Sequence, residues 1–132
     1  MTYTLEVKTN ASTELLDITA AIRDLVARHG PMDGVCFLYS PHTTAGITIN
    51  ENADPSVKAD ILMVLNKIIR ADEPYRHAEG NSPAHIKTTL TGSTAAVLIE
   101  SGRLVLGTWQ GIFLCEFDGP RRRQVKVKFL QG

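Results

Sequence analysis

The stretch IFLCEFDGPRRRQVKVKF, residues 112–129, decides the fold class of this 132-residue chain. Its first half is an apolar run, and in its second half Val125, Val127 and Phe129 alternate with polar side chains. A short apolar run is consistent with a buried strand, and strict alternation is typical of a strand with one face on the core. Gly119-Pro120 is a turn signal between the two halves. The sequence therefore predicts two strands here.

Outward from this stretch, most of the chain has the pattern of short strands. From His85 onward we expect only strands, separated by turns at Gly92-Ser93 and Ser101-Gly102. Towards the N-terminus, alternation at Tyr3, Leu5 and Val7 predicts a half-buried strand. We expect further strands at residues 13–16, 34–40 and 46–50, and a long polar loop over residues 71–84.

Two segments have the start signals and periodicity of helices. Asp17 can cap a helix that runs to about His29, where Gly30 stops it. Asp54 can cap a second helix, with Pro55 at the first helical position, where no amide hydrogen is needed. About eight strands, joined mostly by hairpins, together with these two helices predict an α+β fold with a mostly antiparallel sheet or sandwich. We expect a single domain over residues 1–132.

Composition excludes several classes of partner. Lysine plus arginine and aspartate plus glutamate both number 14, so we expect no nucleic-acid binding, which needs a basic excess. No apolar run approaches the roughly 18 residues of a membrane span, so we expect no membrane partner. The N-terminus lacks the apolar core of a signal peptide, which predicts a cytoplasmic protein.

Three of the four histidines lie in polar, turn-rich segments. His42 lies in SPHTTAGITINENADP (40–55), and His77 and His85 lie in YRHAEGNSPAH (75–85). Imidazole is the commonest protein metal ligand and titrates near neutral pH. If the three rings converge, they form a metal site or an acid/base site. Their spacing matches no standard zinc motif, so metal binding depends on convergence in space.

Other polar residues near these histidines are candidates for substrate contacts and catalysis. Thr43 and Thr44 carry hydroxyls that could hold an anion, and Glu51, which has no evident capping role, could act as a base. Trp109 could stack on a planar ring, although a buried core tryptophan is the plainer interpretation. Glu116 lies on an apolar strand face, where burial needs a partner such as Arg103 or the run Arg121-Arg122-Arg123.

Together these segments resemble one known family. The motifs HTTAGITINENADP (42–55), YRHAEGNSPAHIK (75–87) and GRLVLGTWQGIFLCEFDGPR (102–121) are similar to those of the YjbQ family, in order and over nearly the whole chain. The resemblance implies a compact α+β fold, a homotrimer, and sites near subunit boundaries. It places His42, His77 and His85 on the family's imidazole positions and Glu51, Asn81, Trp109, Gln110 and Glu116 on other motif positions.

The members of that family are described as secondary thiamine-phosphate synthases. The resemblance therefore implies an enzyme, a transferase that joins a thiazole phosphate to an aminopyrimidine pyrophosphate and releases pyrophosphate. We expect a divalent metal, zinc or magnesium, at His42, His77 and His85. We expect catalysis by His77, Glu51 and Glu116 on a small anionic or phosphorylated substrate. The predicted substrate contacts are Thr43, Thr44, Asn81, Ser82, Trp109 and Gln110. A metal-dependent hydrolase and a non-catalytic binder of an anionic metabolite remain alternatives.

Overall fold

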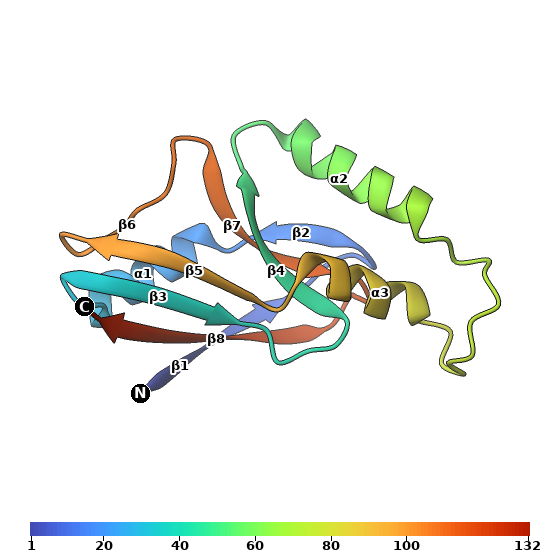
Figure 1. The fold of residues 1–132 in the computed structure, drawn as a ribbon, viewed down its shortest axis with the longest axis horizontal. Helices are drawn as coiled ribbons and strands as arrows, with labels where there is room; N and C mark the ends of the chain where they lie inside the picture. The colour runs from blue at the N-terminus through green and yellow to red at the C-terminus, as the bar shows by residue number, and fades with distance from the viewer.

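Two antiparallel sheets form the body of the protein in the computed structural model, which describes residues 1–132 (Figure 1). The five-stranded sheet has the order β1-β8-β3-β5-β6, and the three-stranded sheet has the order β2-β7-β4. The strands are β1 (Thr2–Lys8), β2 (Glu14–Asp17), β3 (Asp33–Tyr39), β4 (Ala45–Glu51), β5 (Thr94–Glu100), β6 (Arg103–Leu104), β7 (Gln110–Glu116) and β8 (Arg122–Gln131). The predicted α+β class and eight mainly antiparallel strands are confirmed.

The main hydrophobic core follows from the alternation along the strands. Val125 and Val127 of β8 are fully buried, as are Cys36 and Leu38 of the neighbouring β3. Ile112 and Leu114 of β7 belong to the same core cluster, so side chains of both sheets contribute to it. The β8 residues that alternate with them, Gln124, Lys126 and Lys128, place polar side chains on the other face of the strand, as predicted.

The connection at Gly119-Pro120 differs from the predicted hairpin. β7 and β8 follow each other in the chain, but β7 pairs with β2 and β4, whereas β8 pairs with β1 and β3. The turn therefore carries the chain from one sheet to the other. The strand expected at residues 13–16 is present as β2, and it pairs with β7 in the three-stranded sheet.

The first two helices lie where the sequence places them. α1 (Thr19–His29) begins just after Asp17, whose carboxylate accepts hydrogen bonds from the backbone amide and the hydroxyl of Thr19. α2 (Pro55–Ile68) begins after Asp54, which accepts from the amide of Ser56 at 2.9 Å. Neither these helices nor the third has the length and apolar character needed to cross a membrane.

A third helix, α3 (Ser82–Thr91), replaces the strand that was expected from His85 onward. Asn81 precedes it, Pro83 lies in its first turn, and Gly92 ends it with a positive φ of 94°. An asparagine and a proline at the start and a glycine at the end are common start and stop signals of helices. The β-branched residues that follow His85 favour a strand by propensity, and this hides the helix in the sequence. α3 consequently presents His85, Thr88 and Thr89 on one face.

Candidate functional site

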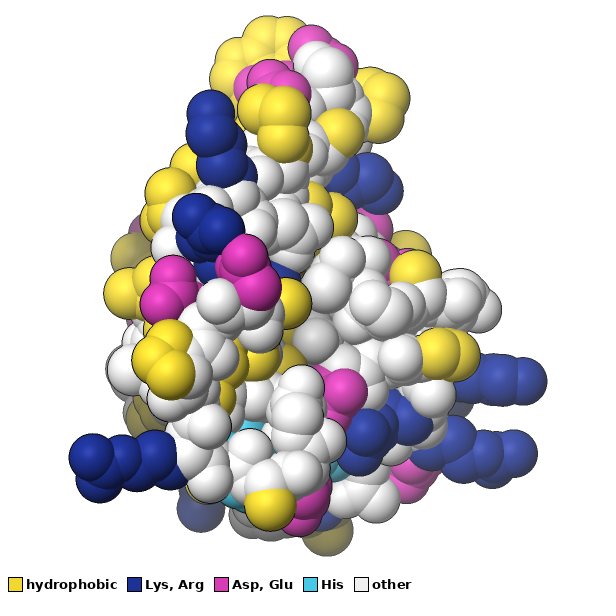
Figure 2. Space-filling model, turned by 90° about the vertical axis from the view of Figure 1, so that its right-hand side faces the viewer, with side chains coloured by type: hydrophobic (Ala, Val, Ile, Leu, Met, Phe, Trp, Pro, Cys, Tyr) yellow, Lys and Arg dark blue, Asp and Glu magenta, His cyan; other side chains and the backbone are white.

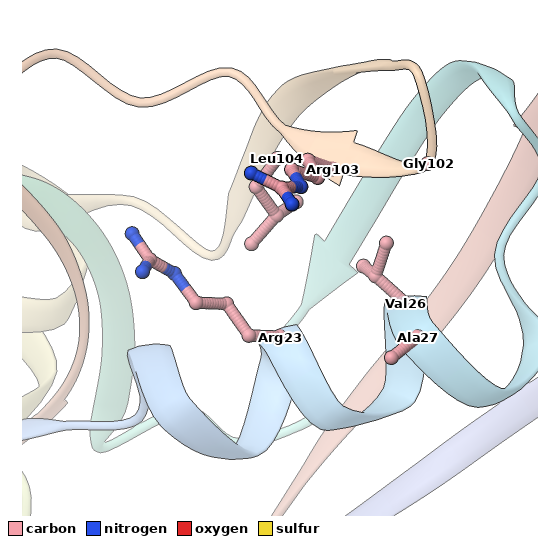
Figure 3. A pocket seen from close by; sticks show the side chains of 6 residues that line it. All are labelled: Arg23, Val26, Ala27, Gly102, Arg103 and Leu104. Atoms are coloured by element: carbon pink, nitrogen blue, oxygen red, sulfur yellow. The ribbon is translucent and has the colours of Figure 1, made fainter.

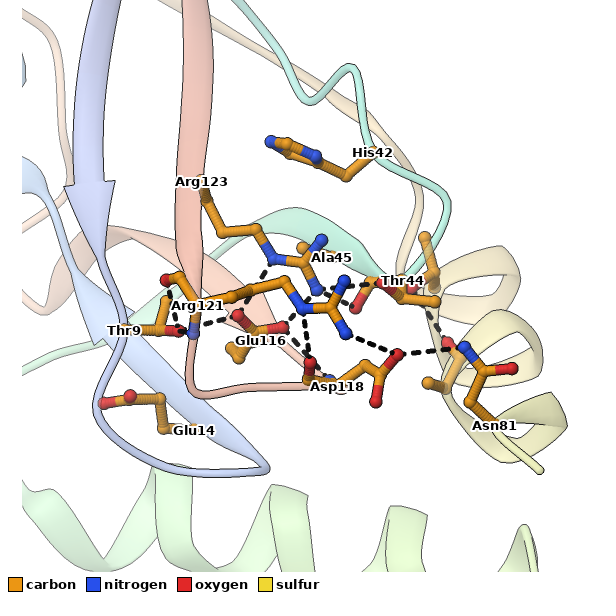
Figure 4. Close-up of polar contacts among 12 residues, drawn as sticks. Thr9, Glu14, His42, Thr44, Ala45, Asn81, Glu116, Asp118, Arg121 and Arg123 are labelled. Atoms are coloured by element: carbon orange, nitrogen blue, oxygen red, sulfur yellow. Dashed lines mark hydrogen bonds and ion pairs between the residues drawn. The ribbon is translucent and has the colours of Figure 1, made fainter. Parts of the chain in front are cut away.

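A buried ion pair joins the two sheets beside α3 (Figure 4). Arg123 of β8 donates from Nε to Glu116 Oε1 at 2.9 Å and from Nη2 to Glu116 Oε2 at 2.5 Å. Glu116 ends β7 and is fully buried, and Arg123 is 3% exposed. The fork of the guanidinium matches both carboxylate oxygens, which is the strongest geometry for such a pair. Glu116, a predicted catalytic residue, is therefore engaged in holding the sheets together.

Further hydrogen bonds complete this pair. Glu116 also accepts from the hydroxyl of Thr9 at 2.7 Å and from the amide of Asp118 at 3.0 Å. Burial alone would raise the pKa of Glu116, but the donors Arg123, Thr9 and Asp118 outweigh it and hold the pKa below its ordinary value. Arg123 Nη2 also donates to the hydroxyl of Thr44 at 2.8 Å, so this predicted substrate contact lies in the same network.

Asp118 extends the network to the start of α3. It accepts from Arg121 Nη2 at 3.2 Å and from Asn81 Nδ2 at 2.9 Å. Because a carboxylate only accepts, the amide nitrogen of Asn81 must face Asp118, and this fixes the direction of its Oδ1. Asn81 Oδ1 is buried and has no partner in the protein. The side chain thus positions α3 against the turn that follows β7.

His42 lies next to this network, and its ring accepts a backbone hydrogen bond that a neighbouring strand would otherwise accept. β3 ends at Tyr39, opposite Lys126, so the amide of Gln124 has no residue of β3 beside it. His42 Nε2 accepts from that amide at 2.9 Å. A backbone N–H can only donate, so Nε2 is unprotonated and the neutral ring carries its proton on Nδ1. His42 is therefore a hydrogen-bond donor through Nδ1.

The surroundings of His42 favour this neutral form. Burial lowers the pKa of His42 below its ordinary value, and the nearby positive charge of Arg123 lowers it further. The negative charge of Glu116 opposes these effects without reversing them. The ring accordingly stays uncharged at neutral pH.

His42 and His85 line one polar hollow of about 330 Å³, which we call the His42 hollow. None of its side chains is hydrophobic; they are His42, Thr43, His85, Thr88, Thr89, Gly92 and Ser93. Its position depends on a close approach at Gly46, where an added Cβ would lie 2.5 Å from the carbonyl oxygen of Gly92. Ile47 and Ser40 then donate backbone hydrogen bonds to Gly92 and Ser93. α3 and the loop after β3 are thereby held side by side.

His77 and His85 line a second, neighbouring hollow. The two rings lie edge to face with centroids 5.3 Å apart, and His77 Nε2 is 3.8 Å from Glu79 Oε2. Ser82, a predicted substrate contact, lines the same hollow of about 310 Å³. On the face that carries α3, only small areas of histidine surface are visible (Figure 2). His85 thus lies between His42 and His77, and each of the other two shares a hollow with it.

The remaining predicted residues lie at the opposite end of the β4–β7 pair. Glu51 is the register partner of Gln110, whereas Ala45 is the partner of Glu116. A strand rises about 3.3 Å per residue, so roughly 20 Å separates the two ends. Glu51 holds the turn before α2, because its carboxylate accepts from the amide of Asp54 at 3.2 Å. Trp109 is 61% exposed rather than buried in the core.

No group of three or more histidine, cysteine, aspartate or glutamate side chains is arranged to hold a metal ion within the chain. The lone pair of His42 Nε2 is occupied by Gln124, and its Nδ1 carries a proton. His42 therefore does not fit the predicted set of three imidazole ligands. His77 and His85 keep free ring nitrogens on adjacent side chains, and metal binding by this pair stays a prediction.

Comparison with known proteins places these motifs in a family. The family model described as "UPF0047 protein YjbQ-like" matches residues 3–132. The chain belongs to this family. Among its YjbQ-like relatives, MJ1081 of Methanocaldococcus jannaschii is 51% identical over 98% of this chain and 94% of its own length. YugU of Bacillus subtilis is 47% identical over 98% of this chain and 99% of its own length.

Solved structures of YjbQ-like proteins have the same fold. A Clostridium acetobutylicum protein superimposes with a TM-score of 0.94, at 50% identity and over 97% of this chain and 99% of its own. A Sulfolobus solfataricus protein gives the same TM-score at 32% identity, over 100% of this chain and 97% of its own. It is described as a YbjQ-like protein of unknown function.

These relatives correct the predicted activity of this YjbQ-like chain. MJ1081 and YugU carry the name UPF0047, the Sulfolobus solfataricus protein is described as of unknown function, and none of them is named a thiamine-phosphate synthase. The predicted thiamine-phosphate synthase activity, a transferase reaction, is therefore wrong. The family resemblance itself is confirmed, and it specifies the fold and the motif positions without specifying a reaction.

Sequence reasoning missed several members of the site. Thr88, Thr89 and Ser93 line the His42 hollow but were assigned to a strand and a turn. The signal that could have found the first two is the helix start at Asn81-Ser82-Pro83, because it puts positions 85, 88 and 89 on one face. Nothing in the sequence indicates Gln124, which meets His42 across 82 residues of chain.

Proposed function

We propose that this protein binds a small oxyanion, the phosphate group of a metabolite, in the His42 hollow. The single observation that carries this proposal is the fixed tautomer of His42, which leaves an Nδ1–H donor without a protein partner on a ring that lines a hollow without hydrophobic side chains. A preset donor needs no rearrangement when the anion binds. Arg121 and Arg123 lie close enough to lower the pKa of His42, and the same positive potential attracts an anion.

The hydroxyls around the hollow divide into donors and acceptors. Thr88 and Thr89 donate to the carbonyls of Ala84 and His85 at 2.9 and 3.0 Å, so their oxygens can only accept from a ligand. The hydroxyls of Thr43 and Ser93 make no hydrogen bond within the protein. A ligand that both accepts and donates suits this arrangement, and a phosphate monoester that keeps one proton does both.

Substitutions at His42 test the proposal by separating its two ring nitrogens. His42→Gln keeps an acceptor near the position of Nε2 for Gln124 but removes the Nδ1–H donor. His42→Ala removes both. We expect calorimetry with inorganic phosphate and with a simple phosphate monoester to show binding to the wild type and a loss of about tenfold or more in both variants, since a hydrogen bond to a charged group contributes about 1.5–3 kcal/mol.

His29 supplies the matched control. It lies at the end of α1, where its ring stacks on Tyr3 with centroids 4.5 Å apart. His29→Gln should bind phosphate as the wild type does. Unchanged affinity in His42→Gln, or no phosphate binding by the wild type, would contradict the proposal. Equal loss in His29→Gln would show that the effect is not specific to the hollow.

A second candidate function, zinc binding, is favoured by the edge-to-face pair His77 and His85. Two adjacent imidazoles with a nearby carboxylate, Glu79, suit zinc better than magnesium. A structural zinc site needs four ligands, and we propose that a neighbouring subunit of a homotrimer contributes the rest. Elemental analysis and light scattering of the untreated protein test this. A metal-free trimer, or zinc retained by a His77→Ala/His85→Ala variant, would reject it.

A further inference from the structure

Two arginines face one hollow at the other side of the molecule from α3. The hollow has a volume of about 410 Å³ and lies between α1 and the short edge strand β6. It is lined by Arg23, Val26, Ala27, Gly102, Arg103 and Leu104. Figure 3 shows Arg23 extending from α1 and Arg103 from β6 into the space between the two elements. We call this the arginine hollow; in Figure 1, α1 and β6 lie well away from α3, the helix that carries three of the residues lining the His42 hollow.

Neither guanidinium has a partner in the protein. The carboxylates close to them are already engaged or are out of reach. Asp24, next to Arg23 in the chain, pairs with Arg28 at 3.1 Å. Asp17 accepts from Thr19 and Asn52. Glu100 is the register partner of Arg103 across β5 and β6, but the two make no ion pair. The hollow therefore holds two uncompensated positive charges.

The floor of the hollow is apolar. Val26 is 4% exposed, and Leu104 is half-buried against the main core. The turn at its edge is held in place, because Gly102 donates to the carbonyl of Met32 at 2.9 Å. Ser101 and Gly102 both have positive φ, 52° and 74°, which sets the direction in which Arg103 leaves the turn. Apolar walls with two charged groups at one side are the usual composition of a small-ligand site.

We propose that the arginine hollow binds an organic acid with an apolar body, its carboxylate or phosphate placed between Arg23 and Arg103. Guanidinium groups recognise such anions through pairs of parallel hydrogen bonds. The anion pairs with the two arginines, and its hydrocarbon part covers Val26 and Leu104. This site is separate from the His42 hollow, so the inference does not rest on the proposed function.

Phenyl phosphate is a suitable probe, with inorganic phosphate and phenol as its two halves. The methyl groups of Val26 and Leu104, observed by NMR, report on this hollow and not on the His42 hollow. We expect phenyl phosphate to shift both methyl signals in a saturable way, and to bind more tightly than either half. Benzoate should shift the same signals, since the site recognises the charge and the ring together.

Substitutions of single residues test whether the two arginines bind the phosphate group of phenyl phosphate. Arg23→Ala and Arg103→Ala should each weaken phenyl phosphate binding about tenfold, as expected for a lost charge-assisted contact. Arg122→Ala is the matched control, because Arg122 is exposed on β8 and has no ion-pair partner; it should bind as the wild type does. Ala27→Phe leaves both charges in place but fills the apolar side, and it should also abolish binding.

Three results would overturn the inference. The first is the absence of methyl shifts with phenyl phosphate and with benzoate. The second is equal weakening by Arg122→Ala, which would mean general attraction to positive charge. The third is unchanged binding in Ala27→Phe. Because His42→Gln leaves this hollow intact, methyl shifts retained in that variant separate a failure here from a failure of the proposed function.

Discussion

The two ends of the β4–β7 pair both carry polar residues that the sequence singles out, yet they are built differently. At the Ala45–Glu116 end, β8, α3 and the loop before β4 bring a buried ion pair, His42 and the His42 hollow together. At the Glu51–Gln110 end, polar side chains mostly hold their own turns: Gln110 accepts from Gly107, and Glu51 accepts from Asp54. Polar sequence motifs alone therefore do not distinguish a site from a well-bonded turn.

The largest expected effect is at the ion pair of the first end. Arg123→Ala leaves Glu116 buried without its charged partner, so we expect a loss of about 3–5 kcal/mol in the free energy of unfolding. Urea denaturation measures this loss. Asp24→Ala, which breaks the exposed pair with Arg28, is the control and should cost less than about 1 kcal/mol. Similar losses in the two variants would contradict the conclusion that the buried pair of Glu116 and Arg123 contributes strongly to stability.

Glycines near the two ends provide a second comparison between them. Gly46→Ala would place a Cβ 2.5 Å from the backbone oxygen of Gly92, which cannot move without displacing the end of α3. We expect it to cost about 1–3 kcal/mol and to weaken phosphate binding. Gly107→Ala, beside the second end, would meet only the side chain of Gln110, at 3.3 Å or more, and that side chain can shift. Thermal denaturation should find the Gly46 variant clearly less stable; the reverse order would contradict this account.

The pH dependence of stability tests whether the folded protein holds His42 in its neutral form. Its pKa is lowered in the folded protein, so the unfolded chain binds the proton more tightly. The stabilisation from the neutral ring is complete above the unfolded value of about 6.5 and is lost as pH falls through the folded pKa. Denaturation midpoints between pH 7 and pH 5 should fall more steeply for the wild type than for His42→Gln. Parallel curves would show that His42 is an ordinary exposed histidine.

The smallest effect is expected at the second end. Trp109 is mostly exposed, so Trp109→Ala should change the free energy of unfolding by no more than about 0.5 kcal/mol. It should also leave phosphate binding unchanged, because the His42 hollow lies at the other end of the strand pair. Denaturation and calorimetry on this variant check both points. A large loss of phosphate affinity would mean that the two ends cooperate in one site.

The sequence was informative where a short segment carries its own signal. Alternation located the strands, Asp54-Pro55 located the start of α2, and Glu116 among apolar neighbours indicated a charged partner that proved to be Arg123. It failed where the outcome depends on distant contacts. The β7–β8 turn has the appearance of a hairpin, and only packing sends the two strands into different sheets.

The candidate site shows the same difference between features with a local sequence signal and features that depend on distant contacts. The sequence identified His42 and His85, which do share a hollow, but it could not assign the ring nitrogens of His42 because their state depends on the amide of Gln124. It misassigned the segment after His85 because threonine and isoleucine there favour strands by propensity, whereas Asn81 and Pro83 at the start and Gly92 at the end are the signals of a helix. Cap signals outweighed propensity in this segment.

The protonation of the two ring nitrogens of His42, observed by nitrogen-15 NMR near neutral pH, tests the central claim most directly. We predict an unprotonated Nε2 and a protonated Nδ1, with a further shift of the Nδ1–H signal when phosphate is added. A proton on Nε2, or a ring that exchanges freely between the two tautomers and ignores phosphate, would contradict the account.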